Sequence, residues 1–249
     1  MAGHSKWANT KHRKARADAA KGKIFTKLAR EISVAAREGG DDLNTNFRLR
    51  LAVQKARENN MPSDNIHRAI QKGTGGSEGE SYEQASYEGY AAGGIAVLLE
   101  ALTDNKNRTV AEIRHIFSRH NGSLGESGCV AWMFTRKGYI ALNKKDLQID
   151  EDDMMLIALD AGAEDVRLED DGSYSIITDL EHFEAVKQAL QDQDIAYTSA
   201  EVTMLPGSTV GITDKDVADR VIRLMEALDE HDDVQNVYAN FDIPEELMA

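Results

Sequence analysis

Eleven side chains near the start of the 249-residue chain have the chemistry to contact a polyanion. Lysine and arginine donate charge-assisted hydrogen bonds to phosphate oxygens, and aromatic rings stack on bases. Residues 1–30 hold nine lysines or arginines and one acid, a net charge of +8, whereas the whole chain carries −14. This asymmetry predicts binding to nucleic acid. The predicted nucleic-acid-binding residues are Lys6, Trp7, Lys11, His12, Arg13, Lys14, Arg16, Lys21, Lys23, Lys27 and Arg30.

Two different kinds of segment have to present these residues. In residues 1–21 the only large apolar side chain after Met1 is Trp7, so this segment cannot bury enough surface to order itself. We predict a flexible basic arm that becomes ordered on binding. The alternative interpretation is that this segment is a charged tail that is simply solvated. Phosphate contacts position a protein without reading sequence, so the arm does not choose between DNA and RNA.

Residues 23–37 are predicted to form an amphipathic helix, because apolar and basic side chains recur at helical spacing on opposite sides. The basic side of this helix continues the positive charge of the arm. We therefore favour a single contact surface over a chance distribution of basic residues. The apolar side consists of Phe25, Leu28, Ile32, Ala35 and Ala36, and the basic side consists of Lys23, Lys27, Arg30 and Arg37.

The remaining pattern predicts an α+β protein. Helices at about 46–59 and 62–73, the latter capped by Ser63, complete a three-helix domain. Thr109–Glu112 resembles a capping box that opens a helix, and Gly128–Phe134 is typical of a strand. The predicted domains are a basic arm (1–21), a helical domain (22–76), a middle α+β domain (77–136 plus 206–249) and an acidic α+β domain (137–205).

The acidic domain has the order strand–helix–strand–strand–helix–strand, which is typical of a ferredoxin-like fold. We predict that it is inserted into the middle domain, which is also expected to be ferredoxin-like and would otherwise lack a helix and a strand. From Asp146 to Glu201 there are 17 acids against only Arg167 and Lys187. This surface is either simply acidic, which we favour, or it faces a basic protein partner.

The chain carries no recognisable enzyme signature. Cys129 has no evident base, since His115 and His120 lie on the polar side of a predicted helix. The seven histidines lack the spacing of metal ligands, and no phosphate-binding loop precedes a helix. The sequence therefore predicts a non-enzymatic protein without catalytic residues, metal site, cofactor or small-molecule substrate. The single cysteine and the lack of a signal peptide or long apolar run predict a cytoplasmic protein without membrane contact.

The chain contains the motifs MAGHSKWANTKHRKARADAAKGKIFTKLAREISVAAREGG, RLRLAVQKARENNMPSDNIHRAIQKGTG, YEGY, TDNKNRT and GSLG. These motifs closely resemble the YebC/PmpR family, which is related to mitochondrial translational activators of cytochrome c oxidase. The resemblance implies three domains, no enzymatic activity and a cytoplasmic location. It also implies a probable DNA-binding transcriptional regulator, or alternatively an RNA- and ribosome-binding translation factor that relieves stalling at difficult stretches such as prolines. The family's basic segment maps onto Lys6, Lys11, His12, Arg13, Lys14, Lys21, Lys23 and Lys27.

Overall fold

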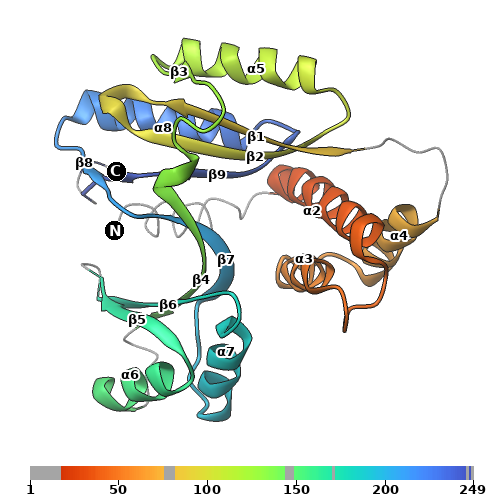
Figure 1. Ribbon diagram of the computed structural model, residues 1–249, viewed down its shortest axis with the longest axis vertical. Coiled ribbons are helices and arrows are strands. Elements are labelled where there is room, and N and C mark those ends of the chain that lie inside the picture. Colours follow the sequence, from red (N-terminus) through yellow and green to blue (C-terminus); the bar gives the residue numbers. More distant parts are fainter. Residues whose placement is uncertain (1–17, 76–81, 144–148, 170–171, 245–246, 248–249) are drawn as a thin grey trace.

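The computed structural model describes residues 18–75, 82–143, 149–169, 172–244 and 247. Figure 1 shows an α+β protein in which a helical domain is followed by two sheet-containing domains. The predicted fold class is confirmed, including the insertion of the third domain within the second. The exact domain boundaries stay predictions.

Three helices build the first domain around an apolar core. Gly73 lets the third helix approach the first, because a Cβ atom there would lie 2.3 Å from the main-chain oxygen of Ser33. The predicted cap at Ser63 is wrong. Ser63 is the first helical residue, and Pro62 at the N-cap makes no side-chain capping bond. The helices are α2 (Asp18–Gly39), α3 (Phe47–Glu58) and α4 (Ser63–Thr74).

The middle domain has a four-stranded sheet in the order β3-β1-β2-β9. Its last helix and strand come from the end of the chain, as predicted. The elements are β1 (Glu83–Tyr90), η1 (Ala92–Gly94), β2 (Ala96–Thr103), α5 (Lys106–Arg119), β3 (Ser123–Leu124), η2 (Ala131–Met133), α8 (Lys215–Asp229) and β9 (Val234–Ala239). A small parallel pair, β8 (Val210–Gly211) and β10 (Phe241–Asp242), lies beside it.

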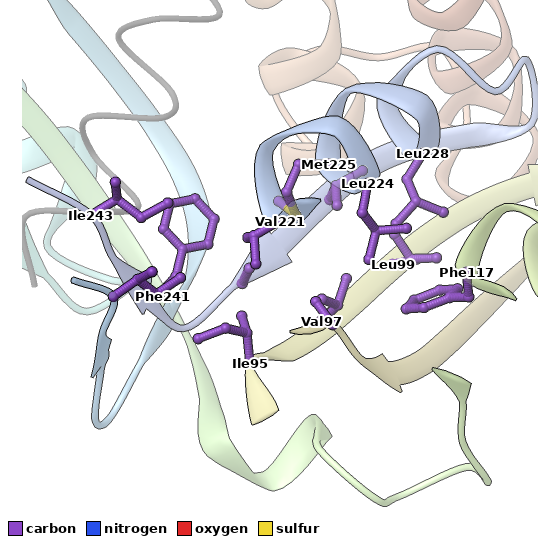
Figure 2. Close-up of a cluster of buried hydrophobic side chains, with 14 of the residues drawn as sticks. Ile95, Val97, Leu99, Phe117, Val221, Leu224, Met225, Leu228, Phe241 and Ile243 are labelled. Carbon is purple, nitrogen blue, oxygen red and sulfur yellow. The ribbon is translucent and has the colours of Figure 1, made fainter. Parts of the chain in front are cut away.

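Strand β2 is apolar from Ala96 to Leu99 because both of its faces are buried there. Val97 and Leu99 point into the core beneath α5 and α8, as Figure 2 shows. Ala96 and Leu98 belong to a second cluster on the other face. Burial on both sides explains why the sequence shows a continuous apolar run rather than alternation.

The third domain carries the predicted ferredoxin-like arrangement. Its antiparallel sheet has the order β5-β6-β4-β7, with two helices on one face. The elements are β4 (Phe134–Asn143), α6 (Glu151–Asp160), β5 (Ala163–Leu168), β6 (Ser173–Thr178), α7 (Phe183–Asp192) and β7 (Ser199–Pro206).

Two further local predictions fail. The capping box at Thr109 is wrong, because α5 begins at Lys106 and the side chain of Asn105 accepts the N–H of Arg108. The strand predicted at 128–134 is a loop and short helix until β4 begins at Phe134.

Candidate nucleic-acid interface

Helix α2 has the two sides that the sequence predicts. Leu28 and Ile32 are buried in the core of the helical domain, whereas Lys23 and Arg37 are exposed. The helix begins at Asp18, so residues 18–21 of the predicted arm are helical. It is therefore longer at its N-terminus than its apolar pattern indicated.

Only part of the predicted binding set can be placed. Lys21 lies within α2, but its side chain is outside the description. Lys23, Lys27 and Arg30 are described in full. The seven predicted residues that lie outside the described residues are Lys6, Trp7, Lys11, His12, Arg13, Lys14 and Arg16.

The three described cations of the predicted binding set contact the C-terminal end of α8 and the residues that follow it. Lys27 Nζ donates to the main-chain oxygen of Asp229, and Lys23 Nζ donates to that of Glu230 at 3.3 Å. Arg30 donates to the main-chain oxygen of Asp232 at 2.7 Å. Carbonyl groups at a helix C-terminus carry partial negative charge and lack partners within the helix. The last turn of α8 has no basic residue of its own, so the helical domain supplies the complementary charge.

Asp233 extends this contact into the middle domain. Its carboxylate is 3% exposed and accepts hydrogen bonds from Arg30 at 3.2 Å, Arg108 at 2.6 Å and Thr109 at 2.7 Å. Burial by itself raises the pKa of the Asp233 carboxyl. The hydrogen bonds from Arg108 and Thr109 and the charges of Arg108 and Arg30 outweigh burial, so this pKa is lowered. The guanidinium of Arg30 also lies 5.0 Å from the ring centroid of Tyr82.

These contacts give the basic side of α2 an intramolecular role that the sequence did not reveal. The acceptors on α8 are mostly main-chain carbonyls, which have no residue signature. The salt bridge between Arg30 and Asp233 joins residues 203 positions apart. Phosphate binding by these three cations would have to compete with the end of α8.

Other cations of the helical domain remain available. Arg37 on α2 and Lys55 and Arg57 on α3 are exposed, and their side chains make no ion pair within the part of the chain that the structure describes. Arg48, by contrast, is bound by Glu31 and Glu38. The sequence alone does not separate these available cations from the paired ones.

The described residues show no assembled catalytic group around Cys129. Burial raises the pKa of its thiol, and the charge of Glu88 raises it further. A thiol with a raised pKa is a poor nucleophile at neutral pH. The nearest described approach to a metal site is the group formed by Glu112, His231 and Asp233.

That group is already engaged without a metal ion. His231 Nε2 lies 2.9 Å from Glu112, and its Nδ1 accepts the main-chain N–H of Asp233. Both carboxylate oxygens of Asp233 receive hydrogen bonds from arginine or threonine side chains. We assign no metal to it.

Comparison with known proteins gives the family of the chain. Residues 5–76 match the TACO1/YebC protein N-terminal domain, and residues 82–241 match the TACO1/YebC second and third domain. The chain belongs to the TACO1/YebC family. The resemblance seen in the sequence is thereby confirmed.

Relatives of this TACO1/YebC chain cover its full length. A probable transcriptional regulatory protein of Natranaerobius thermophilus is 57% identical over 100% of this chain and 99% of that protein. A protein with the same description in Desulfitobacterium hafniense is 56% identical over 99% of this chain and 98% of the relative. Both relatives are described as probable transcriptional regulatory proteins.

A solved structure shares the fold. The crystal structure of a conserved hypothetical protein from Aquifex aeolicus superposes with a TM-score of 0.82 at 48% identity, covering 94% of this chain and 96% of the other. In the described part of the TACO1/YebC chain, every helix is too short or too polar to cross a bilayer.

Proposed function

We propose that this chain is a non-enzymatic, cytoplasmic DNA-binding regulator of transcription that contacts phosphates through its basic arm and the helical domain. The observation that carries the proposal is the concentration of positive charge in residues 1–30 of an otherwise acidic protein. The names of the relatives, which describe probable transcriptional regulatory proteins, support the same role. No cofactor or small-molecule substrate enters this proposal.

The structure refines which residues the proposal rests on. Three cations of α2 already donate hydrogen bonds to main-chain oxygens at the C-terminal end of α8 and in the residues that follow it, namely Lys23, Lys27 and Arg30. The first contacts with phosphate then fall to the arm, that is to Lys6, Lys11, His12, Arg13, Lys14, Arg16 and Lys21, with Trp7 as a stacking group. Arg37, Lys55 and Arg57 extend the surface on the described helices.

The proposal predicts a strong and steep dependence on salt. If about six cations meet phosphates, the logarithm of the binding constant on duplex DNA falls with the logarithm of salt concentration at a slope of about −5. Removal of residues 1–17 leaves the whole of α2 in place. This truncation is expected to abolish most binding and to flatten the slope, measured by filter binding across a salt series.

A matched control removes two exposed cations elsewhere. The double variant Arg220→Ala/Arg223→Ala lies on α8 in the middle domain and should leave affinity and slope unchanged. Truncated protein that binds with the affinity and slope of the full chain would rule out the arm as the contact surface.

A translational role is the second candidate, and one observation favours it. Apart from stacking by Trp7, the contacts proposed above are made to phosphates. Neither stacking nor phosphate contacts distinguish DNA from RNA, so ribosomal RNA would satisfy them as well as DNA. On this alternative the protein binds RNA and the ribosome and relieves stalling at difficult stretches, for example proline-rich ones.

Sedimentation separates the two roles. Lysate is run through a sucrose gradient with and without nuclease, and the protein is located by immunoblot. A transcriptional regulator should be missing from ribosomal fractions and should retard promoter DNA at physiological salt. Sedimentation with ribosomes, without retention of promoter DNA, would favour the translational role.

A further inference from the structure

Helix α6 is apolar on both of its sides, although it lies at the surface. Met154 and Ala158 are buried in the core of the third domain. On the opposite side, Leu156 is 61% exposed and Leu159 is 50% exposed. Residues three apart are neighbours on a helix surface, so the two leucines form one exposed pair. A surface helix of a monomer normally has polar residues on its outer side. The exposed leucine pair on α6 therefore indicates that a binding partner covers this side of the helix.

The edge strand β5 extends this apolar surface. Leu168 is 56% exposed and pairs directly with Tyr174 of β6, whose side chain is buried in the core beneath the helices. Residues directly opposite on neighbouring strands point to the same face of a sheet. Leu168 therefore lies on the side of the sheet that α6 covers, and β5 is the outermost strand of that sheet. Figure 1 shows α6 beside this edge.

Negative charge surrounds these leucines. Asp152, Asp153 and Asp160 are exposed on α6, three or four residues from Leu156. From Asp146 to Glu201 the chain has 17 acids and two cations.

The two cations of this stretch are used internally. Arg167 is paired with Asp165, and Lys187 is buried and contacts Glu184 at 3.1 Å. Neither can neutralise the acids around α6. Within Asp146–Glu201 the acids therefore outnumber the cations by 15, and a partner that covers the exposed leucines would meet this negative charge.

The negative charge and the exposed leucines together select one class of binding partner. Nucleic acid would be repelled. A second copy docked by the same face would set acid against acid, since a symmetric contact brings each patch onto itself. The chain's own arm, residues 1–21, is basic but has no apolar stripe with which to cover two leucines. We propose that the outer side of α6, together with Leu168, is a docking surface for a basic amphipathic helix of another protein. This proposal does not depend on nucleic-acid binding.

A short peptide of leucine and lysine tests the surface directly. The fluorescein-labelled probe has leucines at positions i, i+3, i+4 and i+7, and a second peptide has the same composition in an order that gives a helix no apolar side. Fluorescence anisotropy with the full chain should show binding of the amphipathic peptide at least about tenfold tighter than that of the shuffled peptide. Equal affinities for the two peptides would mean that charge attraction alone binds them, and this would overturn the proposal.

Two variants locate the binding. Leu156→Ser/Leu159→Ser changes exposed side chains, so the fold should persist by circular dichroism, and the preference for the amphipathic peptide should disappear. Leu168→Ser should weaken it in part. Val210→Ser, an exposed apolar position in β8, is the matched control and should bind as the unaltered chain does. Unchanged binding in the double leucine variant would overturn the proposal.

Two further measurements test the other possible binding partners of this surface, which are a second copy of the chain and the chain's own arm. Analytical ultracentrifugation is expected to show no self-association that depends on Leu156 and Leu159. A dimer that the double variant abolishes would assign the surface to a second copy instead. Removal of residues 1–17 is expected to leave peptide affinity unchanged, and a marked gain in affinity would assign the surface to the arm.

Discussion

The side chain of Glu88 determines the path of the loop that precedes β4. Its carboxylate is 4% exposed and accepts main-chain N–H groups from Gly128 at 2.6 Å, Val130 at 2.7 Å and Ala131 at 2.7 Å. Burial alone raises the pKa of the Glu88 carboxyl, but the three N–H donors lower it by more. The charged carboxylate thus satisfies three main-chain groups that would otherwise be unpaired.

We predict that Glu88→Gln destabilises this loop. The amide has one acceptor oxygen, and its NH₂ group would face an N–H donor, so at least one buried group loses its partner. The local cost is about 1–3 kcal/mol. Hydrogen exchange of at least one of the Gly128, Val130 and Ala131 amides should accelerate accordingly. Glu126→Gln, at an exposed position in the same loop, should leave exchange unchanged. Normal protection in the Glu88 variant would show that the carboxylate is dispensable.

This residue also explains why the predicted strand at 128–134 was wrong. The apolar content of that stretch is real, since Val130 and Phe134 are buried in one cluster. Its N–H groups, however, bond to a carboxylate 40 or more positions earlier in the chain instead of to a neighbouring strand. A local pattern contains no information about such a distant acceptor.

At the scale of elements, Asp233 ties α2 and α5 to the segment between α8 and β9. The lowered pKa of its carboxyl makes its contribution to stability depend on pH. In an unfolded chain the side-chain carboxyl of aspartate has a pKa of about 3.9. A group whose pKa is lower in the folded state stabilises the fold above the unfolded pKa, and this contribution is lost as the pH falls through the folded value.

We predict that Asp233→Asn lowers the free energy of unfolding by about 1–3 kcal/mol at pH 7, because it removes a buried charged acceptor. The difference from the unaltered chain should begin to narrow below about pH 4, where the unfolded chain takes up a proton, and should narrow further as the pH falls through the lowered pKa of the folded carboxyl. Urea unfolding at a series of pH values measures both. The exposed Asp41→Asn is the control. A difference that stays constant from pH 7 to pH 3 would contradict the assigned role of the charge.

The same elements show where sequence reasoning succeeded and where it stopped. The apolar and basic sides of α2 follow from residue spacing alone, and Leu28 and Ile32 are buried as predicted. The capping box at Thr109 was a false signal, because its hydroxyl bonds to Asp233, 124 positions away. Asn105 caps α5 instead. Spacing predicts which side of a helix is covered, but not which distant group covers it.

At the scale of the whole molecule, the order of elements was enough to predict the fold class and the inserted domain. The placement of the helical domain was not predictable, because Lys23, Lys27 and Arg30 bind largely to main-chain oxygens at the end of α8. That contact uses cations that could otherwise bind phosphate. The proposed function therefore implies a competition between α8 and nucleic acid for the basic side of α2.

We predict that Asp232→Lys weakens the contact and increases the number of cations that reach phosphate. Asp232 is exposed beside Lys23 and Arg30, so a lysine there repels both. Release of three cations would steepen the salt slope by up to about 3 units on duplex DNA, and small-angle scattering should show a larger radius of gyration. Glu126→Lys makes the same change in net charge in an exposed loop and is the control.

A third variant decides whether the gained slope comes from the released residues. In the Asp232→Lys background, replacement of Lys23, Lys27 and Arg30 by alanine should remove the extra slope while the expanded shape persists. If Asp232→Lys instead has the slope and radius of Glu126→Lys, the α8 contact does not restrain these cations, and the arm alone accounts for binding. If the shape expands without a change in slope, the three residues serve only to hold the helical domain against α8, because released side chains that bound phosphate would displace counterions.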